Sequence, residues 1–276
     1  MTSSRIRFAG RGNSRLAYRI SGGWEDAPVV FLHDLLFTQS AFSAMSTPGL
    51  AVDLRGHGAS ASVANQWIAI TELADDLTAV LDATGAEAAG LVGHGLGGAI
   101  AIEFARKLPN RVRALILIEP DLPAALDHDL DRGARTIRDE LRTSDRDAGE
   151  AAYKGLIDKA LDGYLLPRFG VGWRANASKM RLAAIRRNAS ALAGMLPALD
   201  AYSPARAEIA SIATPAVLLT GPDAAIIDRL IAARLAALLP NAEQAEFAFF
   251  DRLNDPFGGG SAHVLDEFVR ESSKRA

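Results

Sequence analysis

The sequence contains no cysteine among its 276 residues. This absence excludes a disulfide framework, a thiol nucleophile and a thiolate metal site. The formal net charge is only −3, so the chain has no strong field that would favour nucleic acid or an anionic membrane as a partner. No apolar run has the length of a signal peptide or a membrane span, and we therefore expect a cytoplasmic protein.

Hydrophobic residues make up 49% of the chain, enough for one large α/β domain or two small ones. Short apolar runs that read as buried strands alternate with stretches of helical periodicity, such as the one that starts near Thr71 and stops at Gly85. This alternation predicts a mostly parallel sheet with helices on both faces. The strand-like runs are Val29–Leu32, Leu50–Asp53, Leu91–Val92, Ala114–Ile118, Ala216–Thr220 and Ala245–Phe250.

The pattern changes between residues 121 and 206, where strand-like runs disappear and charged helical segments follow one another. We expect helices at 131–142, 148–161 and 178–192. The predicted organisation is therefore a core of residues 1–120 and 207–276 that is interrupted by a helical insertion of residues 121–206.

The segment 89–104 reads as a strand that turns directly into a helix through Gly93-His94-Gly95-Leu96-Gly97. Small residues on both sides of such a corner are typical of a nucleophile elbow, G-x-S-x-G, in which the backbone is strained and closely packed. Here Gly95 stands at the central position. Glycine has no side chain that could attack a substrate, so the nucleophile position is vacant.

Four segments in order carry a resemblance to the α/β-hydrolase superfamily: VVFLHDLL from Val29, VDLRGHGAS from Val52, the elbow, and AVLLTGPD from Ala216. The chain is similar to this superfamily over nearly its whole length, and to its enol-lactonase, esterase and haloperoxidase-like group in particular. The resemblance implies an eight-stranded, mostly parallel sheet, a helical cap over residues 121–206, and a small-molecule ligand or substrate between core and cap.

The resemblance also defines where a Ser-His-Asp triad would lie, and the chain departs from it. The loop 251–260, where these enzymes carry the histidine, has none; the nearest, His263, falls inside the predicted last helix. Asp223 is the candidate acid, one residue before the usual position at Ala224. An ordinary Pro-Asp turn explains Asp223 equally well.

Asp34 replaces the usual glycine of the His-Gly pair that follows the first parallel strand. Aspartate tolerates a positive φ better than most residues, which is one explanation of its presence. The other is chemical: its carboxylate would repel a developing oxyanion but would serve as an acid or base. By the resemblance, the amides of Leu35 and Leu96 form an oxyanion-type pair that needs no side chain.

We expect the pocket between core and cap to include His33, Phe37, His94 and Trp173. Metal-ligand spacing such as H-E-x-x-H is absent, and we expect neither a metal nor another cofactor. The basic run from Lys179 to Arg187, which includes Arg181, is interpreted as a solvated helix face.

Three hypotheses for the function follow. The first is a small-molecule enzyme of hydrolase ancestry that works without a covalent serine, as a lyase or isomerase. The second is a non-catalytic ligand- or partner-binding protein. The third is a hydrolase in which an introduced Ser→Gly change created Gly95, which leaves the missing histidine unexplained.

Overall fold

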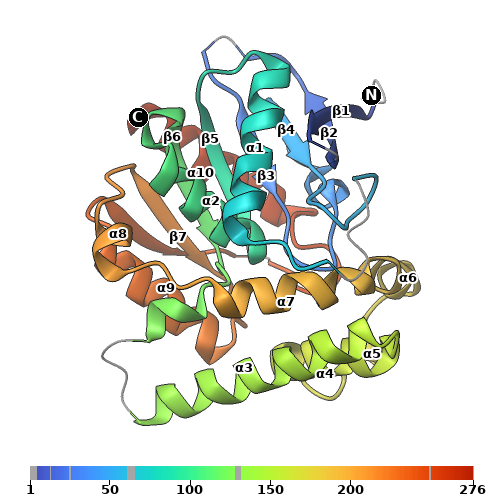
Figure 1. The fold of residues 1–276 in the computed structure, drawn as a ribbon. Helices are drawn as coiled ribbons and strands as arrows, with labels where there is room; N and C mark the ends of the chain where they lie inside the picture. The colour runs from blue at the N-terminus through green and yellow to red at the C-terminus, as the bar shows by residue number, and fades with distance from the viewer. Residues whose placement is uncertain are drawn as a thin grey trace.

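The computed structural model describes residues 5–12, 14–24, 26–60, 66–127, 132–248 and 250–275. For residues 273–275 it describes the backbone alone. One eight-stranded sheet, in the order β1-β2-β4-β3-β5-β6-β7-β8, runs through it (Figure 1). Pairs β1–β2 and β2–β4 are antiparallel and all others are parallel, which confirms the predicted mostly parallel sheet. The strands are β1 (Arg7–Arg11), β2 (Ser14–Ser21), β3 (Val29–Leu32), β4 (Gly49–Val52), β5 (Ala89–His94), β6 (Val112–Ile118), β7 (Ala216–Thr220) and β8 (Ala242–Glu246).

The central strands are apolar on both faces because helices cover both sides of the sheet. In β3, Val30 and Leu32 belong to a core that includes apolar residues of α1 (Ile70–Thr84), α2 (Leu96–Lys107) and α9 (Ile226–Leu238), together with residues of the helices between β6 and β7. Val29 and Phe31 belong to the core beneath α10 (Gly260–Arg275). Alternate side chains of a strand point to opposite faces, so a continuous apolar run supplies both cores.

Two predicted boundaries are corrected by the structure. Helix α1 begins at Ile70 and its N-cap is Ala69, not Thr71; the Glu72 carboxylate accepts a hydrogen bond of 3.2 Å from the Ala69 amide. The predicted C-terminal stop is confirmed, since Gly85 adopts φ 71° directly after the helix.

The last strand is β8 and not the predicted 245–250. Its sequence AEQAE carries little apolar signal because it forms the exposed edge of the sheet. The apolar residues that follow, such as Phe247, are buried in the core instead. Phe249 of the predicted strand and Asp131 of the predicted helix 131–142 lie outside the described residues.

Helices alone fill the described part of the segment between β6 and β7 as far as residue 206, and Figure 1 shows them gathered beyond one end of the sheet, with α7 between the sheet and α3. The prediction of one continuous helix over 148–161 is wrong. Gly155, with φ 72°, lies in a turn that separates α3, which ends at Tyr153, from α4, which begins at Ile157. No described helix combines the length and apolarity that crossing a membrane requires. The helices are α3 (Arg132–Tyr153), α4 (Ile157–Phe169), α5 (Trp173–Asn176), α6 (Lys179–Asn188) and α7 (Leu192–Ala201).

The loop after β4 is held by the buried carboxylate of Asp53. Its two oxygens accept hydrogen bonds from the amide of Gln39 (2.7 Å), the side-chain amide of Gln39 (2.9 Å) and the amide of Ala59 (2.9 Å). The Ser60 hydroxyl donates to the Asp53 carbonyl at 2.6 Å and accepts from the Ala17 amide at 2.8 Å. The loop is thus tied to β2 and to the segment that follows β3, which carries Asp34 toward the elbow.

Replacement of Asp53 by alanine tests this role. The change leaves two buried donors and one partly buried donor without an acceptor, and we expect it to lower the free energy of unfolding by about 3 kcal/mol. Urea denaturation of Asp53→Ala measures the loss. Asp26→Ala is the matched control, because the Asp26 side chain is 85% exposed. Equal stabilities of the two variants would contradict the structural role of Asp53.

Candidate functional site

The predicted elbow is present between β5 and α2. Gly95 has φ 53° and ψ −117°, and it is the N-cap of α2. Its amide donates to the Ile118 carbonyl at 3.0 Å, which fixes the corner to the end of β6. A Cβ at Gly97 would lie 2.3 Å from the Leu32 carbonyl oxygen, so this corner accepts only glycine there. Residue 95 is therefore held at the carboxyl edge of the parallel sheet, in a conformation that strains any other residue.

The Asp34 side chain fills the space that a side chain at position 95 would need. A Cβ built on Gly95 would lie 1.9 Å from Asp34 Oδ1. The same oxygen accepts a hydrogen bond of 2.9 Å from the Leu96 amide. Asp34 thus occupies the space beside residue 95, where the sequence predicts a nucleophile position, and it binds one amide of the pair predicted to hold an oxyanion.

The backbone at Asp34 does not have the positive φ expected from the sequence. Among the described non-glycine residues, positive φ values occur at Leu36 (66°) and Glu119 (42°). The strained backbone of this turn lies two residues later, at Leu36. The Leu36 carbonyl accepts a hydrogen bond of 2.7 Å from Arg181. A need for positive φ therefore does not explain why residue 34 is aspartate. The contacts of its side chain with the Leu96 amide and the space beside Gly95 do explain it.

Burial raises the pKa of Asp34, while the amides of Leu96 and Leu35 and the charges of Arg168 and Arg252 oppose the shift. Within the described chain no cation lies in ion-pair contact with Asp34. A carboxyl group held in this way ionises less readily than one in water, and its anion is the stronger base.

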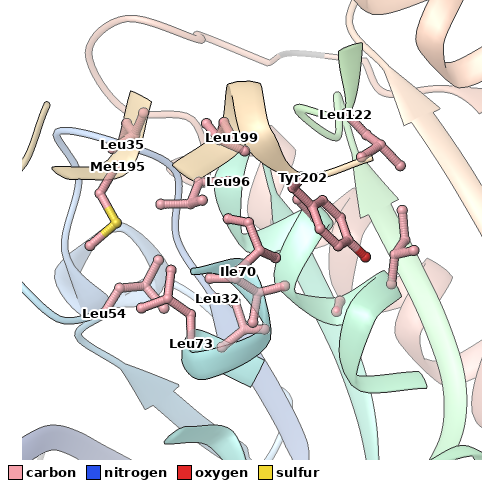
Figure 2. Packing of buried hydrophobic residues seen from close by; sticks show 14 of the residues in the cluster. Leu32, Leu35, Leu54, Ile70, Leu73, Leu96, Leu122, Met195, Leu199 and Tyr202 are labelled. Atoms are coloured by element: carbon pink, nitrogen blue, oxygen red, sulfur yellow. The ribbon is translucent and has the colours of Figure 1, made fainter. Parts of the chain in front are cut away.

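The two amides of the predicted pair are anchored by apolar side chains. Leu35 and Leu96 are buried, and Figure 2 shows their side chains with Met195 and Leu199 of α7. Burial of these side chains in the core fixes the positions of residues 35 and 96. The Leu96 amide is bound to Asp34 Oδ1, and the role of the two amides as an oxyanion pair stays a prediction.

A cavity lies over Gly95, with a volume of about 30 Å³. This is room for about two water molecules. Polar and charged groups dominate its wall; they come from the ends of strands, from helices α4 and α9 and from the loop before α10, while α3 contributes an apolar side chain. The wall consists of Asp34, His94, Gly95, Glu119, Asp121, Leu141, Tyr164, Arg168, Phe169, Asp228, Ile231 and Arg252.

Arg252 forms one of the two ion-pair groups of the cavity. Its Nε lies 2.5 Å from Glu119, and its terminal nitrogen pairs with Asp228. Glu119 also accepts a hydrogen bond of 3.0 Å from the Gly221 amide. Burial raises the pKa of Glu119 to about 7, with Arg252 acting against the shift and Asp228 adding to it.

Arg168 forms the second group. It makes two hydrogen bonds to Asp145, of 2.7 and 2.8 Å, stacks over the Tyr164 ring at 4.0 Å, and lies 3.8 Å from Asp121. Burial raises the pKa of Asp121 to about 7; Arg168 lowers it, and neighbouring carboxylates, Asp145 first, raise it further. The Asp121 amide donates to the Gly95 carbonyl at 2.9 Å. Asp121 is thus joined to the elbow and only loosely paired with a cation.

His94 is the one predicted pocket residue on the cavity wall. Its ring lies among Phe37, Phe250 and Phe257, with centroids 5.3 to 5.8 Å away. Burial lowers the pKa of His94 to about 3, and Arg252 and Arg181 act in the same direction. The imidazole is therefore neutral, and its buried Nδ1 has no hydrogen-bond partner among the described residues.

His33 and His57 hold loops and do not line this cavity. His33 Nδ1 donates to the Asp34 carbonyl at 2.8 Å and Nε2 accepts from the Leu54 amide at 3.0 Å. His57 Nδ1 donates to the Arg55 carbonyl at 3.0 Å. Burial lowers the pKa of His33 to about 4 and that of His57 to about 3, so both rings are neutral.

The remaining candidates lie away from Gly95. Asp223 is exposed in the turn after β7. His263 is exposed on α10, as its position in a helix predicts, and lies 3.3 Å from Glu267. Trp173 is buried with its indole nitrogen 3.0 Å from Asp162, and Phe37 is covered by Arg181 at 3.5 Å. None of these four lines the cavity over Gly95.

The sequence predicts that Arg181 lies on a solvated helix face, and the structure shows that this prediction is wrong. It is buried, and its Nε donates to the Leu253 carbonyl at 2.7 Å. Together with its bond to Leu36, this joins α6 to two loops of the core. The flanking Lys179, Arg186 and Arg187 are exposed, as expected.

Several residues of the cavity are absent from the sequence-based candidates. Glu119 and Asp121 directly follow the buried strand β6, and charged residues in that position were the available signal. Arg168, Asp228 and Arg252 come from three separated segments, and nothing in their local sequence distinguishes them from surface residues.

A family model described as alpha/beta hydrolase fold matches residues 48–251 of the chain. A provisionally named carbamate hydrolase RutD of Stutzerimonas stutzeri (strain A1501) is 30% identical over 266 residues, which cover 90% of this chain and 91% of that protein. The RutD protein of Variovorax paradoxus (strain S110) is 36% identical over 85 residues, 30% of this chain and 32% of that protein. The chain matches about a third or less of the length of the first curated relatives.

Among solved structures, the enol-lactonase from Burkholderia xenovorans LB400 superposes with a TM-score of 0.68 over 97% of this chain and 100% of that one, at 20% identity. A likeness at this identity shows a shared fold.

Gly95→Ala tests the competition between Asp34 and a side chain at position 95. The new Cβ would meet Asp34 Oδ1 at 1.9 Å, in a backbone with φ 53°. We expect a loss of roughly 2–4 kcal/mol in the free energy of unfolding. Adding Asp34→Gly should recover roughly 1–3 kcal/mol of that loss in a double-mutant cycle measured by urea denaturation.

Gly23→Ala is the control for this cycle, because no atom lies within 4 Å of a Cβ added there. If the effects of Gly95→Ala and Asp34→Gly were additive, the two positions would not compete for the same space.

Asp121→Asn tests the raised pKa of Asp121, which is about 7 in the folded chain against 3.8 ordinarily. Between these values the folded state holds a proton that the unfolded state releases, so stability falls as pH rises. Relative to Asp121→Asn, the wild type should lose up to about 1.4 kcal/mol per pH unit. Urea denaturation from about pH 5 to pH 8 measures this difference, which should level off above about pH 7. A difference independent of pH would show that Asp121 ionises normally.

Proposed function

The chain belongs to the alpha/beta hydrolase fold family, and from this premise we propose that it acts on a small molecule by proton transfer, without an acyl-enzyme. The observation that carries the proposal is the position of Asp34. Its carboxylate fills the space of the missing nucleophile and binds the Leu96 amide, so a tetrahedral oxyanion would meet a negative charge at that amide.

Asp34 is the base in this proposal. Its raised pKa makes the carboxylate a stronger base than a solvated one, and the carboxylate faces the cavity at the elbow. A general base with a pKa nearer to neutrality transfers protons efficiently at physiological pH. The carboxylate takes a proton from a carbon or oxygen of the ligand and becomes a carboxylic acid.

Asp121 is the acid that completes the reaction. With a pKa of about 7 it carries a proton in a large fraction of molecules at neutral pH, and it is only loosely paired with Arg168. It returns a proton to a second atom of the ligand, so that an isomerisation neither gains nor loses atoms. Glu119 is less suited, because Arg252 and the Gly221 amide already hold its two oxygens.

The helical segment between β6 and β7 forms the cap of this site in the proposal. Leu141 of α3 and Tyr164, Arg168 and Phe169 of α4 close the cavity over Gly95. Removing water in this way strengthens every charge interaction inside the cavity. The small volume also supports the second candidate, a protein that binds a ligand and does not transform it.

Exchange of hydrogen for deuterium in hydroxyacetone, followed by NMR in D₂O, tests the proposal. We expect exchange at the carbons beside the carbonyl group with the wild type, and a rate lower by about 100-fold or more with Asp34→Asn. Asp26→Asn is the control and should match the wild type, because Asp26 lies outside the cavity.

Two further assays distinguish the alternatives. A burst of p-nitrophenol from an ester, together with labelling by a fluorophosphonate, would overturn the proposal in favour of a serine hydrolase. Absence of both ester turnover and exchange would overturn it in favour of the ligand-binding protein.

A further inference from the structure

The charges on the cavity wall do not balance. Arg252 is shared by Glu119 and Asp228, and Arg168 is shared by Asp145 and Asp121. Each guanidinium group therefore faces two carboxyl groups. Asp34 adds a fifth carboxyl group that has no ion pair within the described chain. Fully ionised, this region would carry more negative than positive charge.

Uncompensated negative charge in a buried region is costly, and either protons or a bound cation can remove it. Protons already do so in part, since burial raises the pKa of both Glu119 and Asp121 to about 7. A cation that entered the cavity would release these protons and take their place.

His94 gives a second, independent indication that the cavity accepts a ligand. The side chain lies on the wall and is only 4% exposed, yet its Nδ1 has no partner among the described residues. A buried polar atom without a hydrogen bond is unusual and costs free energy. The ring is neutral and carries its proton on one of its two nitrogens, so Nδ1 lacks a donor such as N–H in one tautomer and an acceptor in the other.

The size of the cavity limits the charged group that fits. A volume of about 30 Å³ admits about two heavy atoms, the size of methylammonium. In the described parts of the chain no three His, Asp or Glu side chains converge in a way that could hold a metal ion. An ammonium group does not need such convergence, because its three N–H donors can reach separate acceptors.

We infer that the cavity over Gly95 binds the ammonium end of a small primary amine, with Asp34 and Asp121 as acceptors. The inference rests on the proposed function in that it concerns the same site, and it names a class of ligand: an ammonium group that binds Asp121 as a carboxylate competes with the proton that Asp121 carries as the acid. It requires binding only, so it can be tested whether or not the bound molecule is transformed.

Binding should depend on pH, because the ammonium group competes with protons for the same carboxylates. Affinity is expected to rise from about pH 6 to pH 8 as Glu119 and Asp121 lose their protons. The charged and titratable groups that face this region, from all the elements around it, are Asp34, His94, Glu119, Asp121, Asp145, Tyr164, Arg168, Arg181, Asp228 and Arg252.

NMR titration of the full chain with methylammonium chloride measures this binding. Methanol, which has the same size without the charge, and acetate, which has the opposite charge, should bind more weakly by about tenfold or more. Asp34→Asn and Asp121→Asn should each weaken methylammonium binding roughly tenfold. Asp26→Asn is the matched control and should leave the affinity unchanged.

Three results would overturn the inference. One is acetate or methanol binding as tightly as methylammonium. Another is an affinity for methylammonium that stays constant between about pH 6 and pH 8. This measurement needs only the wild type, so it remains decisive if a variant does not fold. The third is equal binding by Asp121→Asn and Asp26→Asn. Failure of deuterium exchange alongside normal methylammonium binding would instead contradict only the proposed catalysis.

Discussion

The hydrogen bond between the Leu96 amide and the Asp34 carboxylate is the interaction on which the site depends. It places a negative group at the amino end of α2, where the helix dipole and the free amides favour it. The same bond closes the position where a nucleophile would stand. The Asp34 carboxylate can take this position only because residue 95 is glycine. The backbone corner and the contacts of Asp34 therefore depend on the same residue.

Much of this arrangement could be predicted from the sequence. The small residues around Gly95 specify the corner, and the apolar runs specify the strands that position it, because both signals are local. The sequence predicts the Asp34 carboxylate beside the oxyanion amides, but not that it fills the space beside residue 95, since this depends on the absence of a side chain 61 residues away. The edge strand β8 was misplaced because an exposed, polar strand lacks the apolar signal.

The charged wall of the cavity shows a different limit of sequence interpretation. Arg168, Asp228 and Arg252 meet only after α4, α9 and the loop before α10 have packed around the end of the sheet. Arg181 looked like part of a solvated face, yet its guanidinium group is buried on the Phe37 ring. Burial of a charge depends on tertiary partners, which helical periodicity does not report.

The mutual exclusion of the Asp34 carboxylate and any side chain at residue 95 has a consequence for substitution at either position. A chain that carries this pair cannot acquire a serine at residue 95 through one favourable step, because the new Cβ would collide with Asp34. Loss of Asp34 first would instead leave the Leu96 amide without its acceptor. Either single change thus adds a collision or removes a hydrogen bond, so residues 34 and 95 are constrained to change together.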